Sequence, residues 1–544
     1  DFVRLMKLLA GYPLAIEVIL SNLGRQSVAE VLVGLDAGDV SFDRAGSKTE
    51  SILQCVEYSH SNLSESAQRS LLCLTLFNGF IDRSNLKNYA EQLQATGTLF
   101  SNLTFESLDS AVGEAIDLGL LAPMSGDNPN LLMIQPVFPY FLKTKLAQMD
   151  GAFREALRLG FKNHYEGLAG YYNQMMKSKE PQEKQLGQIF CKWEYENLYA
   201  ALTIALERQE SISIFVTLDK YLELTQDIQS ELKLSEEINQ RLESYPAMWK
   251  TGEGSREYMT ALNLLGYCYL KTKQYEKANA TYQKELSAEN LAGDRDAQGR
   301  TYHQLGKVYQ ELREFEQARN NYQQALQIFL EFNDFYSQAS TYGQLGILSQ
   351  ELGEFDEARA NYQQALQIYI EYNDRYTQAG IYHNLGIVAQ ELREYEQAFK
   401  DYHQALQIYI EYNDRYSQAR TYHQLGRVAQ ELREYEQARK DYQQSLEIQI
   451  EYNDRYSESI TYSQLGSLAE SMDKISEAIA YHLKALEIRV ALNDQYRINL
   501  TIGNLKRLYQ SHSSDQLLSA IGQAIGCSEA EVLQLFEQLW RTED

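Results

Sequence analysis

The stretch RYTQAGIYHNLGIVAQELREYEQAFKDYHQALQIYIEYND, residues 375–414, decides the fold, because the next forty residues repeat it with about ten changes. Leu-Gly pairs mark the same period along the chain, at Leu265-Gly266, Leu305-Gly306, Leu345-Gly346, Leu385-Gly386, Leu425-Gly426 and Leu465-Gly466. Six repeats of forty residues fit between about Arg256 and Asp494. A period this strict predicts a stack of identical helical units that share one continuous core.

Each repeat predicts two amphipathic helices. In the second repeat, Tyr302, Leu305, Gly306 and Tyr309 follow helical spacing and are expected on one buried face, as are Ala318, Tyr322 and Ala325 of the next helix. Gly306 and Ala318 are small, which indicates a close approach of the two helices. The recurring tyrosines at Tyr302, Tyr342, Tyr382, Tyr422 and Tyr462 are expected to be core residues. An Asn-Asp pair closes each repeat; Asn tolerates a left-handed helix end and Asp caps the next helix.

This pattern resembles the tetratricopeptide repeat, and its forty-residue length and Asn-Asp junction are similar to the longer variant of Pins-type scaffold proteins. The resemblance implies an all-α fold: an α-solenoid over 256–495, followed by capping helices over 496–544. Ser528 and Glu531 have the spacing of a capping box that opens the last helix.

The N-terminal half carries weaker signals. LLAGYPLAIE, residues 8–17, resembles the Gly-x-Pro-Leu-Ala motif of NB-ARC or STAND signalling NTPases, and residues 51–82 are similar to the start of the winged-helix domain that follows it there. Glu194, Asn197, Leu198 and Ala201 match a helical pattern often found after that domain. The resemblance implies an ARC-like end and linker over 1–47, a winged helix over 48–150 and irregular helical pairs over 151–255.

The same resemblance implies nucleotide contacts at Pro13 and at Gln135, which stands where the family usually has histidine. No GxxxxGK[ST] loop occurs in the sequence, so ATP or ADP would bind a longer parent protein and this chain needs no cofactor. Because the sequence begins with Asp1, we expect a piece of that parent: the regulatory and sensor half, without the NTPase core.

In the family, the repeats hold the ATPase off until a ligand docks, commonly in cytoplasmic defence or stress signalling, and the parent could oligomerise. Two other functions stay open: a constitutive assembly scaffold, and a transcription regulator whose winged helix reads DNA. Few Lys or Arg residues lie within 51–150, which disfavours DNA binding.

Composition narrows the function further. Lys and Arg number 50 against 75 Asp and Glu, a net charge of −25 that repels nucleic acid and anionic membranes. No apolar run reaches the ~20 residues of a membrane-spanning helix. Five scattered cysteines are typical of buried thiols in a reducing compartment. No HExxH, GxSxG or Cys/His zinc spacing appears, so we expect neither an enzyme nor a metal site.

A basic stripe is the candidate partner site. Arg300, His303 and Lys307 are spaced i, i+3, i+7, on the face that lines the concave groove of tetratricopeptide proteins. The equivalent stripe three repeats later is Arg420, His423 and Arg427, and the intervening positions are small or apolar, with Ile347, His383 and Ile387. An acidic protein or peptide fits two cationic ends with an apolar middle, and the histidines predict tighter binding as pH falls through about 6.5.

A simpler interpretation is that Lys307 and Arg427 pair with Glu311 and Glu431, four residues on. Such pairs contribute only ~0.2–0.5 kcal/mol, and a base before an acid is the weaker order. The two interpretations differ in whether these cations are free to meet a partner.

We predict that the purified chain does not hydrolyse ATP, because it lacks the loop and lysine that hold the phosphates. Phosphate release in the presence of Mg²⁺ should equal the buffer background. Turnover that rises with protein concentration and disappears on chelation of Mg²⁺ would contradict this prediction.

Overall fold

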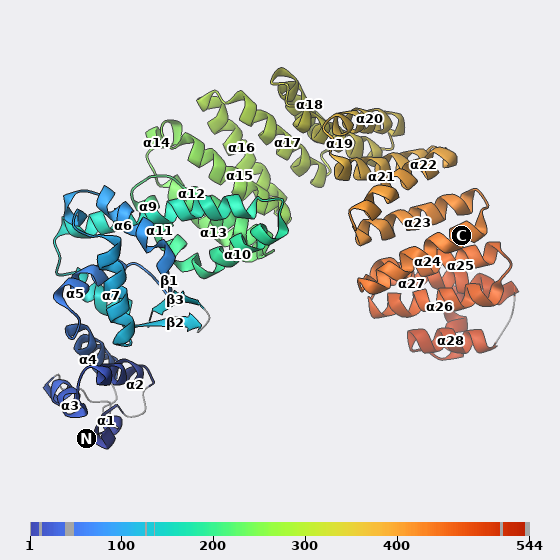
Figure 1. Cartoon of the computed structure of the whole chain (residues 1–544). Coiled ribbons are helices and arrows are strands. Elements are labelled where there is room, and N and C mark those ends of the chain that lie inside the picture. Colours follow the sequence, from blue (N-terminus) through green and yellow to red (C-terminus); the bar gives the residue numbers. More distant parts are fainter. Residues whose placement is uncertain are drawn as a thin grey trace. The chain divides into compact units, whose positions relative to one another are not determined.

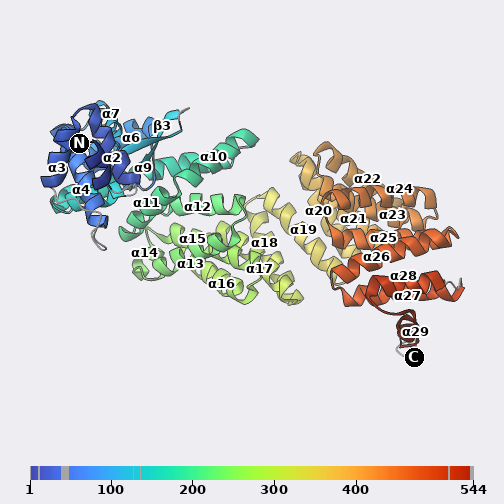
Figure 2. The same ribbon diagram turned by 90° about the horizontal axis from the view of Figure 1, so that it is seen from below.

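The computed structural model describes residues 2–9, 13–37, 48–125, 128–134, 137–511 and 515–538. The chain divides into two compact parts, an N-terminal part up to Gly293 and a C-terminal part from Asp294. Helices dominate both parts (Figures 1 and 2). Among the described residues, none of the helices combines the length and the apolar character that crossing a membrane requires.

The first helices form a small core of their own. It contains Leu5, Leu9, Ala15, Ile19, Val31, Leu32, Leu35 and Cys55. The helices are α1 (Phe2–Leu8), α2 (Pro13–Leu20), the short helix η1 (Ser21–Gly24), α3 (Val28–Ala37) and α4 (Lys48–Ser61). Asn22 ties η1 to α4, because its buried side chain donates to Ser59 Oγ at 2.7 Å.

A three-stranded antiparallel sheet follows, in the order β1-β3-β2. Phe80 of β1 lies opposite Met133 of β3, and Leu121 of β2 lies opposite Ile134. The strands are β1 (Phe80–Asp82), β2 (Leu121–Ser125) and β3 (Asn128–Ile134); the helices around them are α5 (Glu65–Leu71), α6 (Leu86–Ala95), α7 (Phe105–Asp117) and α8 (Val137–Leu146), with short helices η2 (Leu72–Leu74), η3 (Arg83–Asn85) and η4 (Thr98–Phe100).

Buried polar residues join this sheet to the helices that follow. Asn197 accepts the backbone N–H of Asn78 at 2.6 Å and donates to the Phe80 carbonyl at 3.2 Å. Glu194 accepts from Asn197 at 2.7 Å and from Tyr165 at 2.9 Å. The helices are α9 (Gly151–Met176), α10 (Pro181–Trp193), α11 (Tyr195–Glu207), α12 (Ser213–Leu224), α13 (Ile228–Glu243) and α14 (Ala247–Thr251).

The first forty-residue repeat belongs to the N-terminal part. Its helices are α15 (Ser255–Lys271) and α16 (Tyr275–Ala292). Tyr258, Ala261 and Leu262 of α15 join the same hydrophobic core as the sheet and α9–α13. The sequence boundary expected at 255/256 therefore crosses a continuous core, and the division of the chain comes one repeat later.

The C-terminal part continues the repeats. Their helices are α17 (Arg295–Glu311), α18 (Phe315–Glu331), α19 (Phe335–Glu351), α20 (Phe355–Glu371), α21 (Arg375–Glu391), α22 (Tyr395–Glu411), α23 (Arg415–Glu431), α24 (Tyr435–Glu451), α25 (Arg455–Ser471) and α26 (Ile475–Ala491); the chain ends with α27 (Gln495–Ser511), α28 (Asp515–Ile525) and α29 (Glu529–Gln538). Ser528 and Glu531 form the expected capping box before α29.

The Asn-Asp junctions act as the sequence predicts. Asn373 and Asn413 have φ of 52° and 54°, a left-handed backbone that ends the preceding helix. Asp374 then accepts the backbone N–H of Thr377 at 3.1 Å, and Asp414 that of Ser417 at 3.0 Å. Each junction ends one helix and starts the next within two residues, so the repeats keep a constant geometry.

In the first five repeats, a glycine of the first helix lies against a tyrosine ring of the second helix. A Cβ placed on Gly386 would come within 2.7 Å of the Tyr402 ring, and one on Gly426 within 2.7 Å of Tyr442. The tyrosine hydroxyls donate to Gln390 and Gln430 at 3.3 and 3.2 Å. Within the described repeats, the fully buried tyrosines are those of the second helices, Tyr282, Tyr322, Tyr362, Tyr402 and Tyr442.

The tyrosines of the first helices differ from the expectation. Tyr302, Tyr342, Tyr382 and Tyr422 are half-buried, and Tyr462 is buried. One side of each half-buried ring reaches the surface because its position lies at the edge of the apolar face, beside the fully buried Leu-Gly pair.

Two glycines of α21 give a matched test. We predict that Gly386→Ala destabilises the chain by about 1–3 kcal/mol, because the methyl group overpacks against Tyr402. Gly380→Ala should be neutral or stabilising by up to about 1 kcal/mol, because its Cβ has only the Tyr409 hydroxyl within reach, at 4.0 Å, and alanine favours the helix. Urea unfolding followed by circular dichroism measures both; equal effects would show that the glycine-tyrosine contact does not set the spacing of the helices.

Candidate functional site

The first helices of the repeats line the inner side of the C-terminal solenoid. From α17 to α25, each first helix contacts the first helix of the next repeat as well as the second helix between them. The second helices of successive repeats, α18, α20, α22 and α24, contact one another less. Because the closer-packed helices lie on the inside of a curved stack, α17, α19, α21 and α23 lie along its inner side (Figure 1). We call this inner side the groove.

The α17 residues of the predicted partner site lie at one end of this groove. Arg300 is exposed and pairs with Asp296, one turn earlier on the same helix. Lys307 is half-buried, and burial lowers the pKa of its ammonium group. No ion pair joins Lys307 to Glu311 among the described residues, so the simpler interpretation does not hold for this lysine.

The other end is formed by α23. Arg420 is exposed, and Arg427 is half-buried and donates to Gln424 at 3.1 Å. Over the described part of the chain, neither arginine forms an ion pair, and the expected Arg427–Glu431 pair is absent. Gln424, which the sequence analysis missed, lies one turn before Arg427 on the same face, so i, i+3 spacing could have found it.

Arginines on the second helices behave differently. Arg319 pairs with Glu357 at 3.1 Å, Arg359 with Glu394 at 2.6 Å and Arg439 with Glu477 at 3.1 Å, each with an acid of the next repeat. These cations are used to join neighbouring repeats. Within the described ranges, Lys307, Arg420 and Arg427 form no such ion pair.

The predicted histidines contribute to packing between repeats. Nδ1 of His303 lies 3.0 Å from Thr341 Oγ1 on the next first helix, and His383 and His423 make the same contact with Thr421 and Thr461 at 3.2 and 3.0 Å. The Thr341 hydroxyl donates to the Ser337 carbonyl at 2.8 Å, so it accepts from a neutral Nδ1–H imidazole.

Burial keeps these imidazoles neutral. Burial, together with the nearby cations Lys307, Arg420 and Arg427, lowers the pKa of His303 to about 3 and those of His383 and His423 to about 4. The expectation that the histidines gain charge near pH 6.5 is therefore wrong. Their place beside the groove follows from the spacing, but they point into the contact between repeats.

Between the cationic ends, the groove floor is apolar. Ile347 of α19 and Ile387 of α21 are half-buried, and each packs against a hydrophobic cluster that its own repeat shares with the next. Gly343 replaces the histidine of α19, and Gly380 stands where α17 and α23 have arginine. The arrangement of Arg300, Lys307, Ile347, Ile387, Arg420 and Arg427 on successive inner helices agrees with the predicted order.

The two residues assigned by resemblance to a nucleotide lie elsewhere. Pro13 begins α2, a first-turn position that suits proline because no N–H is needed there. Gln135 lies outside the described residues. Both belong to the N-terminal part and neither bears on the groove.

A family model described as Tetratricopeptide repeat matches residues 257–331, 337–411, 377–451 and 417–491. The repeats from α15 to α26 are tetratricopeptide repeats. This confirms the repeat family, its register and the all-α solenoid expected from residues 375–414.

Solved structures extend the likeness beyond the repeats. A STAND protein with a tetratricopeptide repeat sensor from Pyrococcus horikoshii is similar over 99% of this chain and 70% of its own, with a TM-score of 0.64 and 16% identity. BtubC from P. vanneervenii is similar over 40% of this chain and 92% of its own, with a TM-score of 0.37 and 24% identity. At these identities the first likeness shows the fold alone. Comparison with curated proteins finds no match.

The neutral histidines predict a pH-dependent stability. Below pH 6.5 the unfolded chain binds protons that the folded chain does not, so stability is lost as pH falls from 6.5 towards 4, by about 2 kcal/mol per histidine at pH 5. The variant His303→Ser/His383→Ser/His423→Ser, which copies Ser463 of the last repeat, should lose less stability between pH 7.5 and 5 than the parent. Equal losses in urea unfolding would contradict the burial of neutral imidazoles.

Proposed function

We propose that the chain is a protein-interaction scaffold whose tetratricopeptide groove binds an acidic peptide or protein segment along α17, α19, α21 and α23. The observation that carries the proposal is a set of groove cations, Lys307, Arg420 and Arg427, that form no ion pair in the part of the chain that the structure describes, in a chain of net charge −25. In an acidic protein, surface cations are readily paired, as Arg359 is with Glu394. Cations left unpaired on one face favour an anionic ligand there.

The positions of these cations favour a charge-assisted contact. Lys307 is partly removed from water, as the lowered pKa of its ammonium group reflects, so a carboxylate placed beside it would replace lost hydration. Ile347 and Ile387 offer half-buried apolar surface between the charged ends. A ligand with acidic ends and an apolar centre therefore matches the groove in both charge and polarity.

We further propose that the chain is the regulatory and sensor half of a STAND signalling ATPase. Its likeness in fold to the P. horikoshii protein supports this. So does the antiparallel sheet β1-β3-β2 with helices α4–α8 around it, because these are the kinds of elements that make up a winged-helix domain. ATP or ADP binding, oligomerisation and a cytoplasmic defence or stress role would belong to the full-length parent. The chain itself would act without catalysis.

Charge reversal tests the groove. The ligands are a series of peptides with three glutamates at each end of an apolar centre, and the length of the centre varies along the series. We predict that Arg420→Glu/Arg427→Glu weakens binding to these peptides at least tenfold, because two attractive contacts become repulsive. Fluorescence anisotropy measures the affinity. The matched control is Lys400→Glu/Lys440→Glu, which makes the same change in net charge at exposed positions of α22 and α24, the second helices on either side of α23.

Binding of the parent should weaken as salt rises, since exposed charges are screened beyond about 8–10 Å. It should change little between pH 7.5 and 5.5, because the histidines stay neutral. Equal affinity of the groove variant and the control variant, or no binding by any peptide of the series, would refute the groove assignment.

A further inference from the structure

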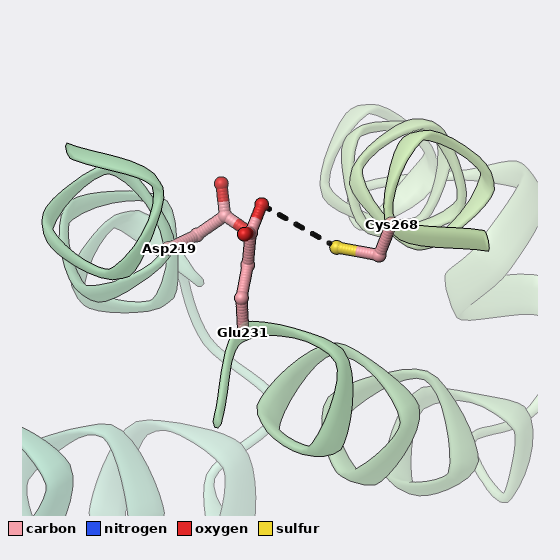
Figure 3. Close-up of side chains that lie close together, drawn as sticks. All are labelled: Asp219, Glu231 and Cys268. Carbon is pink, nitrogen blue, oxygen red and sulfur yellow. Dashed lines mark hydrogen bonds between the residues drawn. The ribbon is translucent and has the colours of Figure 1, made fainter. Parts of the chain in front are cut away.

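Three side chains of types that can coordinate a metal ion lie close together in the interior of the N-terminal part, far from the groove in sequence. Asp219 comes from α12, Glu231 from α13 and Cys268 from α15, and their exposed fractions are 6%, 1% and 1%. One carboxylate oxygen of each acid and the Cys268 sulfur all lie within 4.8 Å of one another. Figure 3 shows the three side chains directed toward one another from separate helices.

The hydrogen bonds of this group are unevenly distributed. Glu231 accepts from Lys271 Nζ at 2.8 and 3.1 Å, and the Cys268 thiol donates to Glu231 Oε1 at 3.6 Å. Ser235 Oγ lies 3.7 Å from the sulfur. Asp219 Oδ1, in contrast, is buried and has no hydrogen-bond partner among the described residues.

A buried carboxylate oxygen without a partner is costly, and the Asp219 carboxylate lies beside that of Glu231. Two acids packed together need a proton or a cation between them. Lys271 supplies one positive charge, and its ion pair is with Glu231. The arrangement thus leaves Asp219 with an unmet requirement for a positive group.

We propose that Asp219, Glu231 and Cys268 form a binding site for a divalent cation of the zinc class. The thiolate selects a borderline or soft metal over Mg²⁺ and Ca²⁺, which prefer oxygen ligands alone. Two carboxylates and one thiolate carry three negative charges, and a divalent ion together with Lys271 balances them. Ligands of a tetrahedral zinc ion lie about 3.5 Å apart, so side-chain rotations would bring these atoms into range.

The site would fasten three helices of the irregular region to one another. α12 and α13 precede the regular repeats, and α15 is the first helix of the first repeat. These helices lack the Asn-Asp junctions that keep the later repeats in register. Cys268 lies two residues after Gly266, the glycine of the first Leu-Gly pair. A metal ion held by side chains of all three helices would supply the missing restraint, as structural zinc does in other proteins.

Metal titration of the full chain tests the proposal, in a Cys527→Ser background because Cys527 is the exposed thiol. After removal of metal by a chelator, the protein should bind one equivalent of Zn²⁺ in competition with a chromogenic chelator, and Zn²⁺ should raise its melting temperature. Co²⁺ should give a thiolate-to-metal charge-transfer band and the intense visible absorption of a tetrahedral site.

Variants assign the ligands. Asp219→Asn and Cys268→Ser should each lower zinc affinity at least tenfold and remove the rise in melting temperature, whereas Cys73→Ser, a buried thiol outside the group, should keep one equivalent. The proposal fails if the background protein binds no stoichiometric zinc or gives no thiolate band, or if both ligand variants bind as the background does. Should a variant fail to fold, the cobalt spectrum of the background protein decides alone. A site that only shares a proton between Asp219 and Glu231 would show no binding.

Discussion

The contact between a side-chain-free glycine and a buried tyrosine ring governs the regular half of this protein. Gly306, Gly346, Gly386 and Gly426 each leave room for the ring of the tyrosine sixteen residues later, at a distance that any Cβ would violate. The tyrosine hydroxyl is satisfied by a glutamine of the first helix, as Tyr322 is by Gln310 at 3.0 Å. The last repeat uses the same device with His482 against Gly466, and His482 Nε2 lies 2.9 Å from Glu470.

The groove is a consequence of that spacing. Because every repeat brings its two helices to the same separation and every Asn-Asp junction turns the chain in the same way, the first helices follow one another along one side. Residues at the same position of successive repeats then form a row along the solenoid. The residues of a row can be core aromatics, structural histidines or cations. Arg420, which forms no ion pair among the described residues, and Arg359, which pairs with Glu394, differ in row, and we propose that this difference separates partner-binding charge from charge that joins repeats.

The sequence predicted the features that a forty-residue period repeats. The helix pairs, the left-handed Asn413, the Asp414 cap and the close approach at Gly386 all follow from local chemistry that recurs in register. Spacing did not predict how deep a residue lies: His383 shares a stripe with Ile387, but the Thr421 hydroxyl of the next repeat draws its ring inward. The Asp219, Glu231 and Cys268 group was invisible because it joins three helices that have no common period.

The central claim is that partner binding uses the inner face of the first helices. Hydrogen–deuterium exchange of the chain with and without the tightest peptide of the graded series tests it directly, since bound backbone and its neighbours exchange more slowly. The account predicts added protection in α17, α19, α21 and α23 and unchanged exchange in α18, α20, α22 and α24. Protection confined to the second helices or to the N-terminal part would contradict it.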